Sequence, residues 1–331
     1  MKRRTLLGAL GAAALGTPFA SAAQTAKTPP TAARRVAVLA PSTRESEERN
    51  LKPFFERMRE LGWIEGQNVV YERSYADNQM GRLLELAQKL VARNPDVIYA
   101  PPAEAARAAR TATGAIPIVF GSALDPVGTG LIKSFARPGG NVTGVSTAAD
   151  VLAPKRLQLL TEALPAARRI GILFDQSQLQ GQSERMAFEQ AAVTIGVTVI
   201  VAAASDPREL ESAVQALLAQ KVDAIAPVQS SLFFNLRKRV VELAGKAKVP
   251  VIAHRTQNAE DGALLAYGPV LADQIRRSAD LVDKVLKGAD PAVTPVELAT
   301  KFETAVNLKT ARSLGITLPP SILLRAERVI E

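Results

Sequence analysis

Short apolar runs rich in Val and Ile alternate along this chain with longer segments in which apolar residues recur every three to four positions. The short runs predict buried β-strands, and the longer segments predict amphipathic helices. Because strands separated by helices are typical of parallel sheets covered on both faces, the sequence predicts an α/β fold with Rossmann-like sheets. The predicted strands span residues 35–40, 68–73, 96–100, 116–120, 169–174, 197–202, 222–228 and 249–253.

Two predicted helices carry especially regular apolar stripes. Residues on one face of a helix recur at i, i+3, i+4 and i+7, and such a stripe normally packs on a sheet. We therefore assign both stripes to the protein core. One contains Leu51, Phe54, Phe55, Met58 and Leu61, and the other contains Ile275, Ala279, Val282 and Leu286.

The first and second halves of the chain share landmarks at a nearly constant separation of 127 to 134 residues. Each half has a strand start, a glycine after a helix, an aspartate before a buried strand and a proline before the next strand. Such self-similarity indicates a structural repeat. We therefore predict two similar lobes. The corresponding pairs are Val36 and Ile170, Gly62 and Gly196, Asp96 and Asp223, and Pro117 and Pro250.

The N-terminus has the pattern of an export signal over residues 1–23. Basic Lys2, Arg3 and Arg4 precede an apolar run at 6–15, and Ala20-Ser21-Ala22 forms an A-x-A cleavage site. The run is shorter than the roughly 20 apolar residues that span a bilayer, so we favour cleavage over a membrane anchor. The arginine pair also resembles a twin-arginine signal. Residues 24–34 are predicted to be a flexible leader, and the mature protein is expected to be free in the periplasm.

Composition excludes several kinds of site. The chain has no cysteine, so it has no disulfide, no thiolate metal site and no lipid-modified cysteine. The formal charge of +9 includes Lys2, Arg3 and Arg4, and their removal with the signal leaves +6. The remaining basic residues fall on predicted helix surfaces without interleaved aromatic residues, which favours solvated faces over nucleic-acid binding.

The loops that follow the predicted strands are short and contain polar or small residues. In doubly wound sheets, ligands bind in the crevice beyond the carboxyl ends of the strands. Two facing lobes would form a cleft between such loops, where hydroxyl, amide and carboxylate groups suit a small polar molecule. The predicted ligand-binding residues are Ser42, Tyr75, Ser122 and Asp125 in the first lobe, Asp175, Gln229, Ser230 and His254 in the second, and Tyr267 near a crossover.

Signatures of catalysis are missing from the sequence. It lacks the motifs for phosphate-binding loops, nucleophile elbows and dinucleotide binding. His254 is the only histidine, so a catalytic zinc site is not expected, and we favour a structural or ligand-contacting role for this residue. We therefore predict a protein that is not an enzyme and needs no cofactor or metal.

Two further segments admit more than one interpretation. Asp125 follows the strand at 116–120, and its carboxylate could contact a ligand or cap a helix that carries Leu131, Ile132 and Phe135. Residues 137–144 are rich in Pro and Gly and lie between the two halves, where a crossover or hinge is expected.

Several segments resemble one known family, the ABC transporter substrate-binding proteins of the tryptophan/tyrosine-binding type. The similarity covers nearly the whole mature chain. It rests on residues 117–128 (PIVFGSALDPVG), 137–146 (RPGGNVTGVS), 155–160 (KRLQLL), 262–269 (GALLAYGP), 286–288 (LKG), Pro291, 300–303 (TKFE), 307–311 (NLKTA) and 314–315 (LG).

The resemblance implies a type I periplasmic binding-protein fold, in which three crossovers join the two lobes. It also implies a separate permease and a separate ATPase as partners. By this likeness, lobe 1 comprises residues 35–145 plus about 264–292, and lobe 2 comprises 146–263 plus about 293–331. A helix from about 271 to 287 would belong to lobe 1.

Three functions are compatible with the sequence. The export signal, the repeated lobes and the missing catalytic motifs favour a solute-binding protein that captures a small polar molecule, such as an amino acid or related compound, for an ABC importer. The same clamp could serve a periplasmic sensor for a membrane receptor. An enzyme on this scaffold is a weaker alternative, because fold does not determine function.

Overall fold

The computed structural model describes residues 33–147, 149–177 and 181–331. The expected export signal at 1–23 and most of the expected leader at 24–34 lie outside these residues. In the described part of the chain, none of the helices has both the length and the apolar character required to cross a membrane.

Six parallel strands form the first sheet, in the order β11-β5-β4-β3-β1-β2. Four of the predicted strands, at 35–40, 68–73, 96–100 and 116–120, are confirmed as β1 to β4. We call this sheet and the helices around it lobe 1. Its strands are β1 (Arg34–Ala40), β2 (Val69–Tyr75), β3 (Val97–Tyr99), β4 (Ile118–Ala123), β5 (Val142–Ser146) and β11 (Glu297–Leu298).

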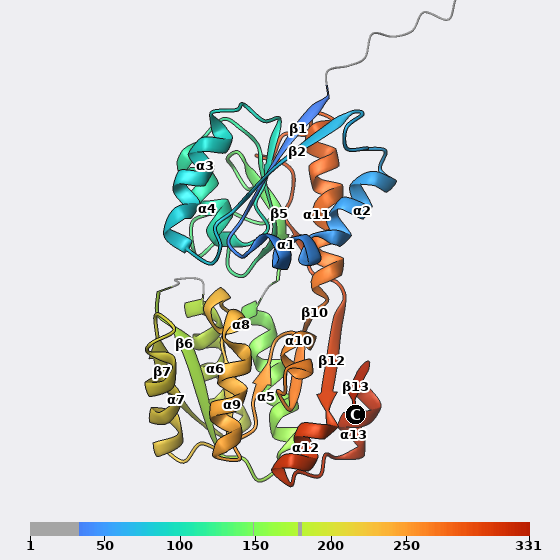
Figure 1. Ribbon diagram of the computed structural model, residues 1–331. Helices are drawn as coiled ribbons and strands as arrows, with labels where there is room; N and C mark the ends of the chain where they lie inside the picture. The colour runs from blue at the N-terminus through green and yellow to red at the C-terminus, as the bar shows by residue number, and fades with distance from the viewer. Residues whose placement is uncertain (1–32, 148, 178–180) are drawn as a thin grey trace, which may run out of the picture. The chain divides into compact units, whose positions relative to one another are not determined.

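Helices cover both faces of the lobe 1 sheet (Figure 1). One face packs against α3 and α4, and the other packs against α2 and α11. The predicted stripes supply the second face, where Phe54, Met58, Ile275 and Val282 are buried in one cluster. The helical elements are α1 (Arg44–Asn50), α2 (Lys52–Glu60), the 3-10 turn η1 (Met80–Arg82), α3 (Leu83–Val91), α4 (Ala103–Ala112) and α11 (Leu271–Leu286).

The remaining strands build lobe 2, in the orders β7-β6-β8 and β13-β12-β10-β9. A single bridge between Ile225 and Val251 connects the two sets. All strand pairs are parallel except that of β10 with β12. The strands are β6 (Arg169–Asp175), β7 (Thr198–Ala204), β8 (Ala224–Pro227), β9 (Ile252–Ala253), β10 (Leu265–Pro269), β12 (Phe302–Asn307) and β13 (Arg328–Ile330).

In lobe 2, α5 packs against α6 and α7 packs against α9. Their apolar residues share one buried cluster with the strands. The predicted α/β fold with parallel sheets is therefore confirmed in both lobes. The helices are α5 (Ala149–Ala163), α6 (Gly181–Ile195), α7 (Leu210–Ala219), α8 (Ser231–Asn235), α9 (Arg237–Lys246), α10 (Thr256–Glu260), α12 (Leu308–Leu314) and α13 (Pro320–Arg325).

The repeat between the lobes extends to individual hydrogen bonds. The Asp96 carboxylate accepts a hydrogen bond of 2.7 Å from the Arg35 backbone N–H, and the Asp223 carboxylate accepts one of 2.8 Å from the Arg169 backbone N–H. Each aspartate thus ties the start of its lobe's first strand to the start of the third. Gly62 and Gly196 both have positive φ, of 91° and 82°, which a glycine after a helix adopts without strain.

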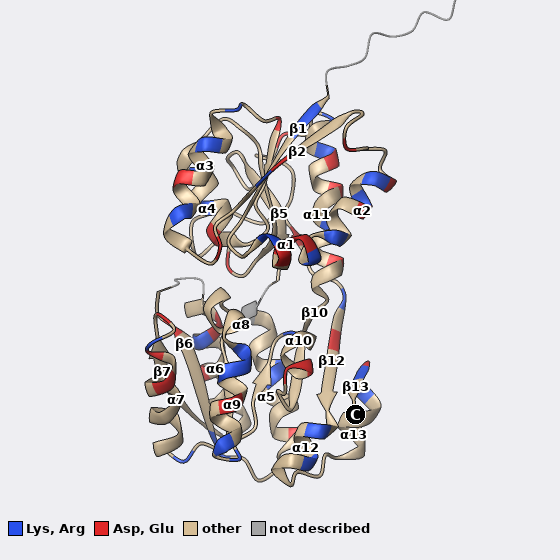
Figure 2. Ribbon diagram, viewed as in Figure 1, with Lys and Arg blue, Asp and Glu red and all other residues tan. Residues whose placement is uncertain are grey.

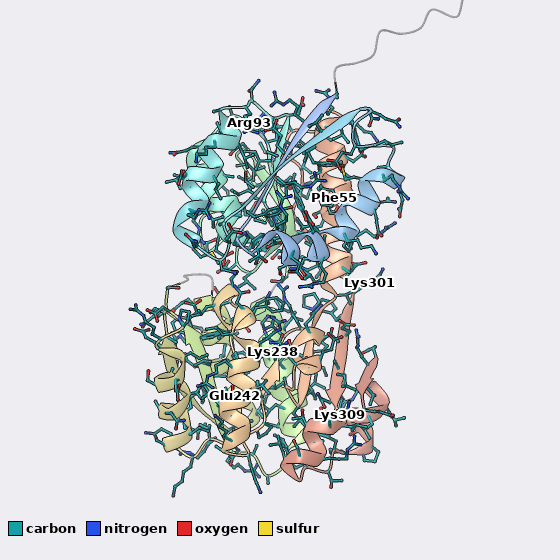
Figure 3. The ribbon with its side chains drawn as sticks, viewed as in Figure 1. Phe55, Arg93, Lys238, Glu242, Lys301 and Lys309 are labelled. Carbon is teal, nitrogen blue, oxygen red and sulfur yellow. The ribbon has the colours of Figure 1, made fainter. Side chains whose placement is uncertain are left out.

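Three segments cross between the lobes: β5 to α5, β10 to α11, and β11 to β12. They are joined by backbone hydrogen bonds of 3.0 Å, from Ala299 N–H to Ser146 O and from Val270 N–H to Lys301 O. Lys301, labelled in Figure 3, also contacts the Asp273 carboxylate of α11 at 2.8 Å. The crossovers therefore form one hydrogen-bonded unit.

The lobe boundaries lie later than the resemblance implied. Residues 265–269 form β10, which pairs with β9 and β12 in lobe 2, so the chain enters lobe 1 after Pro269 instead of near Leu264. It leaves lobe 1 after Leu298, because β11 pairs with β5. Strand pairing determines both boundaries, because the backbone groups of β10 are hydrogen-bonded to the lobe 2 sheet and those of β11 to the lobe 1 sheet.

Two local predictions between β4 and β5 are wrong. Residues 142–144 of the expected hinge region belong to β5 (Val142–Ser146), which is buried in lobe 1, and the crossover comes after this strand. The helix expected to carry Leu131, Ile132 and Phe135 is instead a series of turns. Leu131 and Ile132 are nevertheless buried, so core packing explains their apolar character without a helical period.

Close packing of β5 against β4 makes Gly144 sensitive to substitution. A Cβ atom at this position would overlap the carbonyl oxygen and the ring of Phe120. We expect Gly144→Ala to lower the free energy of unfolding by about 1–3 kcal/mol, the usual range for overpacking. Gly140→Ala is the matched control, because its Cβ would meet open space. Equal melting temperatures for the two variants would contradict this packing.

Candidate functional site

A cavity lies where the carboxyl ends of strands from both lobes meet, after β1, β3 and β4 in lobe 1 and after β8 and β9 in lobe 2. Its volume is about 100 Å³. Lobe 1 contributes Pro41, Ser42, Glu47, Asn50, Leu51, Pro101, Pro102, Ala103, Glu104, Ser122, Leu124, Leu271 and Ile275, and lobe 2 contributes Gln229, Ser230, Ser231, Phe234, Asn235, His254 and Arg255.

The structure brings five of the predicted ligand-binding residues together in this cavity: Ser42, Ser122, Gln229, Ser230 and His254. They lie at the ends of four different strands in two lobes. The rule that ligands bind beyond the carboxyl ends of strands therefore correctly predicts which residues line the cavity in these five cases. Contact of each residue with a ligand stays a prediction.

Two of the other predicted residues are engaged away from the cavity. Tyr75 is buried at the end of β2, and the Arg44 guanidinium lies 5.8 Å from the centre of its ring. Tyr267 belongs to β10, where its ring stacks on that of Phe302 with centroids 6.3 Å apart. Both aromatic rings therefore pack against neighbouring side chains outside the cavity lining.

The two predicted aspartates also lie outside the cavity lining. The Asp125 carboxylate accepts a hydrogen bond of 2.7 Å from Gly128 N–H, which closes the turn after β4, and another from the Ser183 hydroxyl. Asp175 is fully buried and accepts bonds from the backbone and hydroxyl of Ser177, at 3.0 and 2.6 Å. Burial raises the pKa of Asp175. These bonds give both aspartates a structural role.

Sequence reasoning missed Glu47, which α1 places in the cavity. Thr43 caps α1 by accepting a hydrogen bond from Ser46 N–H at 3.4 Å. The Glu47 carboxylate is buried and accepts a bond of 3.2 Å from Ser42 N–H. Burial raises the pKa of Glu47, although the bonds from Ser42 and the charge of Arg255 oppose this effect. An acidic first turn normally stabilises an exposed helix end, so the sequence did not single it out.

Arg255 and Glu104 were also missed, and they bring charges of both signs to the cavity. The Arg255 guanidinium lies 4.9 Å from the centre of the Phe234 ring. Burial lowers the pKa of Arg255 to about 10, against the influence of Glu104 and Glu47, so the side chain remains cationic at neutral pH. Glu104, in the first turn of α4, accepts a hydrogen bond of 3.1 Å from the Ser231 hydroxyl of lobe 2.

His254 provides a neutral polar group in the cavity wall. Its side chain is 2% exposed, and neither ring nitrogen has a hydrogen-bond partner among the residues that the structure describes. Burial lowers its pKa well below 6.5, and the nearby charges of Arg255 and Arg156 lower it further. A neutral imidazole can donate one hydrogen bond and accept another.

These groups suit the binding of a small dipolar molecule. Glu47 and Glu104 can receive an ammonium group, Arg255 can receive a carboxylate, and the serine hydroxyls with His254 can meet uncharged polar atoms. Within residues 33–147, 149–177 and 181–331, no group of three or more histidine, cysteine or acidic side chains could hold a metal ion. Away from the cavity, acidic and basic residues are interspersed on the helices of both lobes (Figure 2).

Comparisons with protein families, with characterised proteins and with solved structures give results that agree with one another. The family of ABC transporter substrate binding proteins matches residues 35–330. A tyrosine-binding protein from Clostridioides difficile (strain R20291) is 28% identical over 265 residues, which make up 80% of this chain and 76% of that protein.

Two solved structures are similar over most of the chain. An ABC domain from Streptococcus pneumonia in complex with L-Trp has a TM-score of 0.85 and 28% identity, covering 90% of this chain and 100% of that chain. The ligand-free, open structure of a substrate binding protein with adhesive properties from Clostridium difficile has a TM-score of 0.69 and 25% identity, covering 90% of this chain and 99% of that chain.

The burial of His254 generates a prediction that a single titration can check, because the chain has no other histidine. We expect the ring to stay neutral as the pH passes downward through 6.5, and its NMR carbon shifts to remain constant there. Tag-free protein unfolded in urea is the control, since its exposed ring should titrate near 6.5. A midpoint at or above 6.5 in the folded protein would contradict the lowered pKa of the buried ring.

Proposed function

This chain belongs to the ABC transporter substrate-binding protein family, and from this premise we propose that it is an exported receptor that captures a small zwitterionic molecule and delivers it to an ABC importer. The solved relatives confirm the predicted type I periplasmic binding-protein fold. Members of the family bind solutes and are not enzymes, so the protein acts by binding and release.

The proposal that the ligand is a zwitterion rests on the arrangement of charged residues in the cavity. Glu47 and Glu104 extend from helices of lobe 1, whereas Arg255 extends from lobe 2. A zwitterion placed between them would pair its ammonium group with the carboxylates and its carboxylate with the guanidinium. Each charge removed from water would then have a partner, which such burial requires.

The relatives support an amino acid as the class of ligand. One is described as a tyrosine-binding protein, and another was solved with L-Trp. Tyrosine and tryptophan share the α-ammonium and α-carboxylate groups, which are the charges that Glu47, Glu104 and Arg255 complement.

The two-lobed construction supports a role in transport. A ligand that contacts both lobes stabilises the closed arrangement, and a permease can distinguish that arrangement from an open one. The expected partners are a permease and an ATPase, and the expected location is the periplasm. The signal pattern at residues 1–23 supports export.

The ligand can be identified by mass spectrometry of small molecules released when the purified protein is denatured. With that compound, we expect Arg255→Gln to weaken binding at least tenfold, because the ligand carboxylate loses a charged partner. Arg237→Gln is the matched control: Arg237 lies 4.5 Å from the Phe234 ring centre, but its guanidinium pairs with Asp261 at 2.6 Å and is not part of the cavity lining.

Binding is measured by calorimetry, and melting temperatures check that both variants are folded. Equal affinities for Arg255→Gln and Arg237→Gln would contradict the assignment of Arg255 to the ligand carboxylate. A wild-type protein that releases no small molecule and gains no thermal stability from any amino acid would contradict the proposed function itself.

Export gives a separate prediction. Because the basic, apolar and cleavage regions of a signal are all present, the mature chain should begin near Ala23 or Gln24. N-terminal sequencing of protein from a periplasmic extract measures this directly. A product that retains Met1 and sediments with membranes would exclude cleavage.

A further inference from the structure

A buried ion pair stands behind the cavity, in lobe 2. Glu184, in the first turn of α6, and Arg156, in α5, are 1% and 2% exposed, and their charged groups are 2.6 Å apart. The Arg156 guanidinium also lies 5.2 Å from the centre of the Phe188 ring. Neither residue lines the cavity. A buried ion pair of this kind is weak evidence for stability, because desolvation opposes the attraction.

The ion pair is connected to the cavity wall through Glu184. The second carboxylate oxygen of Glu184 accepts a hydrogen bond of 2.8 Å from the backbone N–H of Gln229. Gln229, Ser230 and Ser231 follow β8 and all line the cavity. A bond to a charged acceptor is about twice as strong as one between neutral groups, so Glu184 anchors the start of this loop firmly.

The adjacent residue on α6 faces lobe 1. The hydroxyl of Ser183 donates a hydrogen bond to the Asp125 carboxylate, which is itself held by Gly128 N–H at 2.7 Å. The turn after β4 thus presents a fixed acceptor to lobe 2. One helical turn therefore contacts the ligand loop through Glu184 and the opposite lobe through Ser183.

We propose that the first turn of α6 couples contact between the lobes to the conformation of the ligand loop, with Glu184 and Arg156 as positioning residues that never touch the ligand. The inference rests on the proposed function, since it specifies how closure and binding influence each other. When Ser183 bonds to Asp125, α6 is held where Glu184 meets Gln229. When the loop is displaced, α6 loses one of its two anchors. Such coupling is reciprocal by thermodynamic necessity.

The first test replaces the pair by apolar residues of similar size, Arg156→Met together with Glu184→Leu. Such replacements of buried ion pairs are often neutral or stabilising, and Met can pack against the Phe188 ring. The fold should therefore persist, as its melting temperature will show. We expect hydrogen exchange at the Gln229 amide to become at least tenfold faster, because its charged acceptor is gone. Glu189→Gln, in the exposed part of the same helix, is the control.

The second test measures the distance between the lobes with spin labels. The chain has no cysteine, so Lys89→Cys in α3 and Lys238→Cys in α9 provide the only labelling sites. Both side chains are exposed, at 65% and 77%, and Lys238 is labelled in Figure 3. We expect the double apolar variant to lose part of the population at the shorter distances, because α6 loses its bond to the Gln229 backbone and Ser183 is then held less firmly against Asp125.

Ser183→Ala tests the coupling from the other side. It should reduce the same short-distance population and also speed exchange at Gln229, which Ser183 does not contact. Ser212→Ala is its control, because the Ser212 hydroxyl bonds only within its own helix region at 2.9 Å. Unchanged lobe distances in the double apolar variant, or unchanged Gln229 exchange in Ser183→Ala, would overturn the proposal. Both readouts need no added ligand, so they stand apart from the test of the proposed function.

Discussion

The parallel direction of the strands is the constraint from which the site follows. In a parallel sheet all carboxyl ends lie at one edge, and the helices that follow begin there with unpaired N–H groups. Each lobe repeats this arrangement, and the three hydrogen-bonded crossovers join the lobes so that loops from both edges line one cavity. Residues far apart in sequence, such as Ser42 and His254, line the same cavity for this reason.

Charges of opposite sign enter the cavity from the two lobes. Glu47 and Glu104 come from lobe 1 and Arg255 from lobe 2, and each influences the protonation of another. A carboxylate buried by itself would favour its neutral form, which is the direction in which burial shifts Glu47. Opposite charge on the facing lobe counteracts this shift. A zwitterionic ligand would add one charge of each sign to this arrangement.

Behind the cavity wall, polar residues hold the loops that follow the strands of lobe 2 in place. Asp175 binds the backbone and hydroxyl of Ser177, Ser230 caps α8 by accepting a 3.1 Å bond from Phe233 N–H, and Glu184 holds Gln229. Buried polar groups of this kind are expensive unless they are satisfied, and once satisfied they limit the loop to few conformations. A rigid loop loses little entropy when a ligand binds.

The sequence by itself determined the α/β fold, the repeat of two lobes and the strand ends at which a site could form, because the patterns involved are local: apolar period, glycine after a helix, polar residue after a strand. It also led to Ser42, Ser122, Gln229, Ser230 and His254, which lie at or just after the ends of strands. The local sequence pattern also predicted a helix after Asp125. The structure has turns there instead, and these turns are sufficient to bury Leu131 and Ile132.

Only the tertiary structure decided which charges enter the cavity. Glu47, Glu104 and Arg255 stand at helix starts, where charged residues are usually exposed, and nothing in their spacing separates them from the many solvated charges of the chain. The Arg156–Glu184 pair and the contact of Ser183 with Asp125 join segments of different elements, so no local pattern reports them. Long-range packing determines such contacts, because it fixes which side chains lose their water and must find partners within the protein.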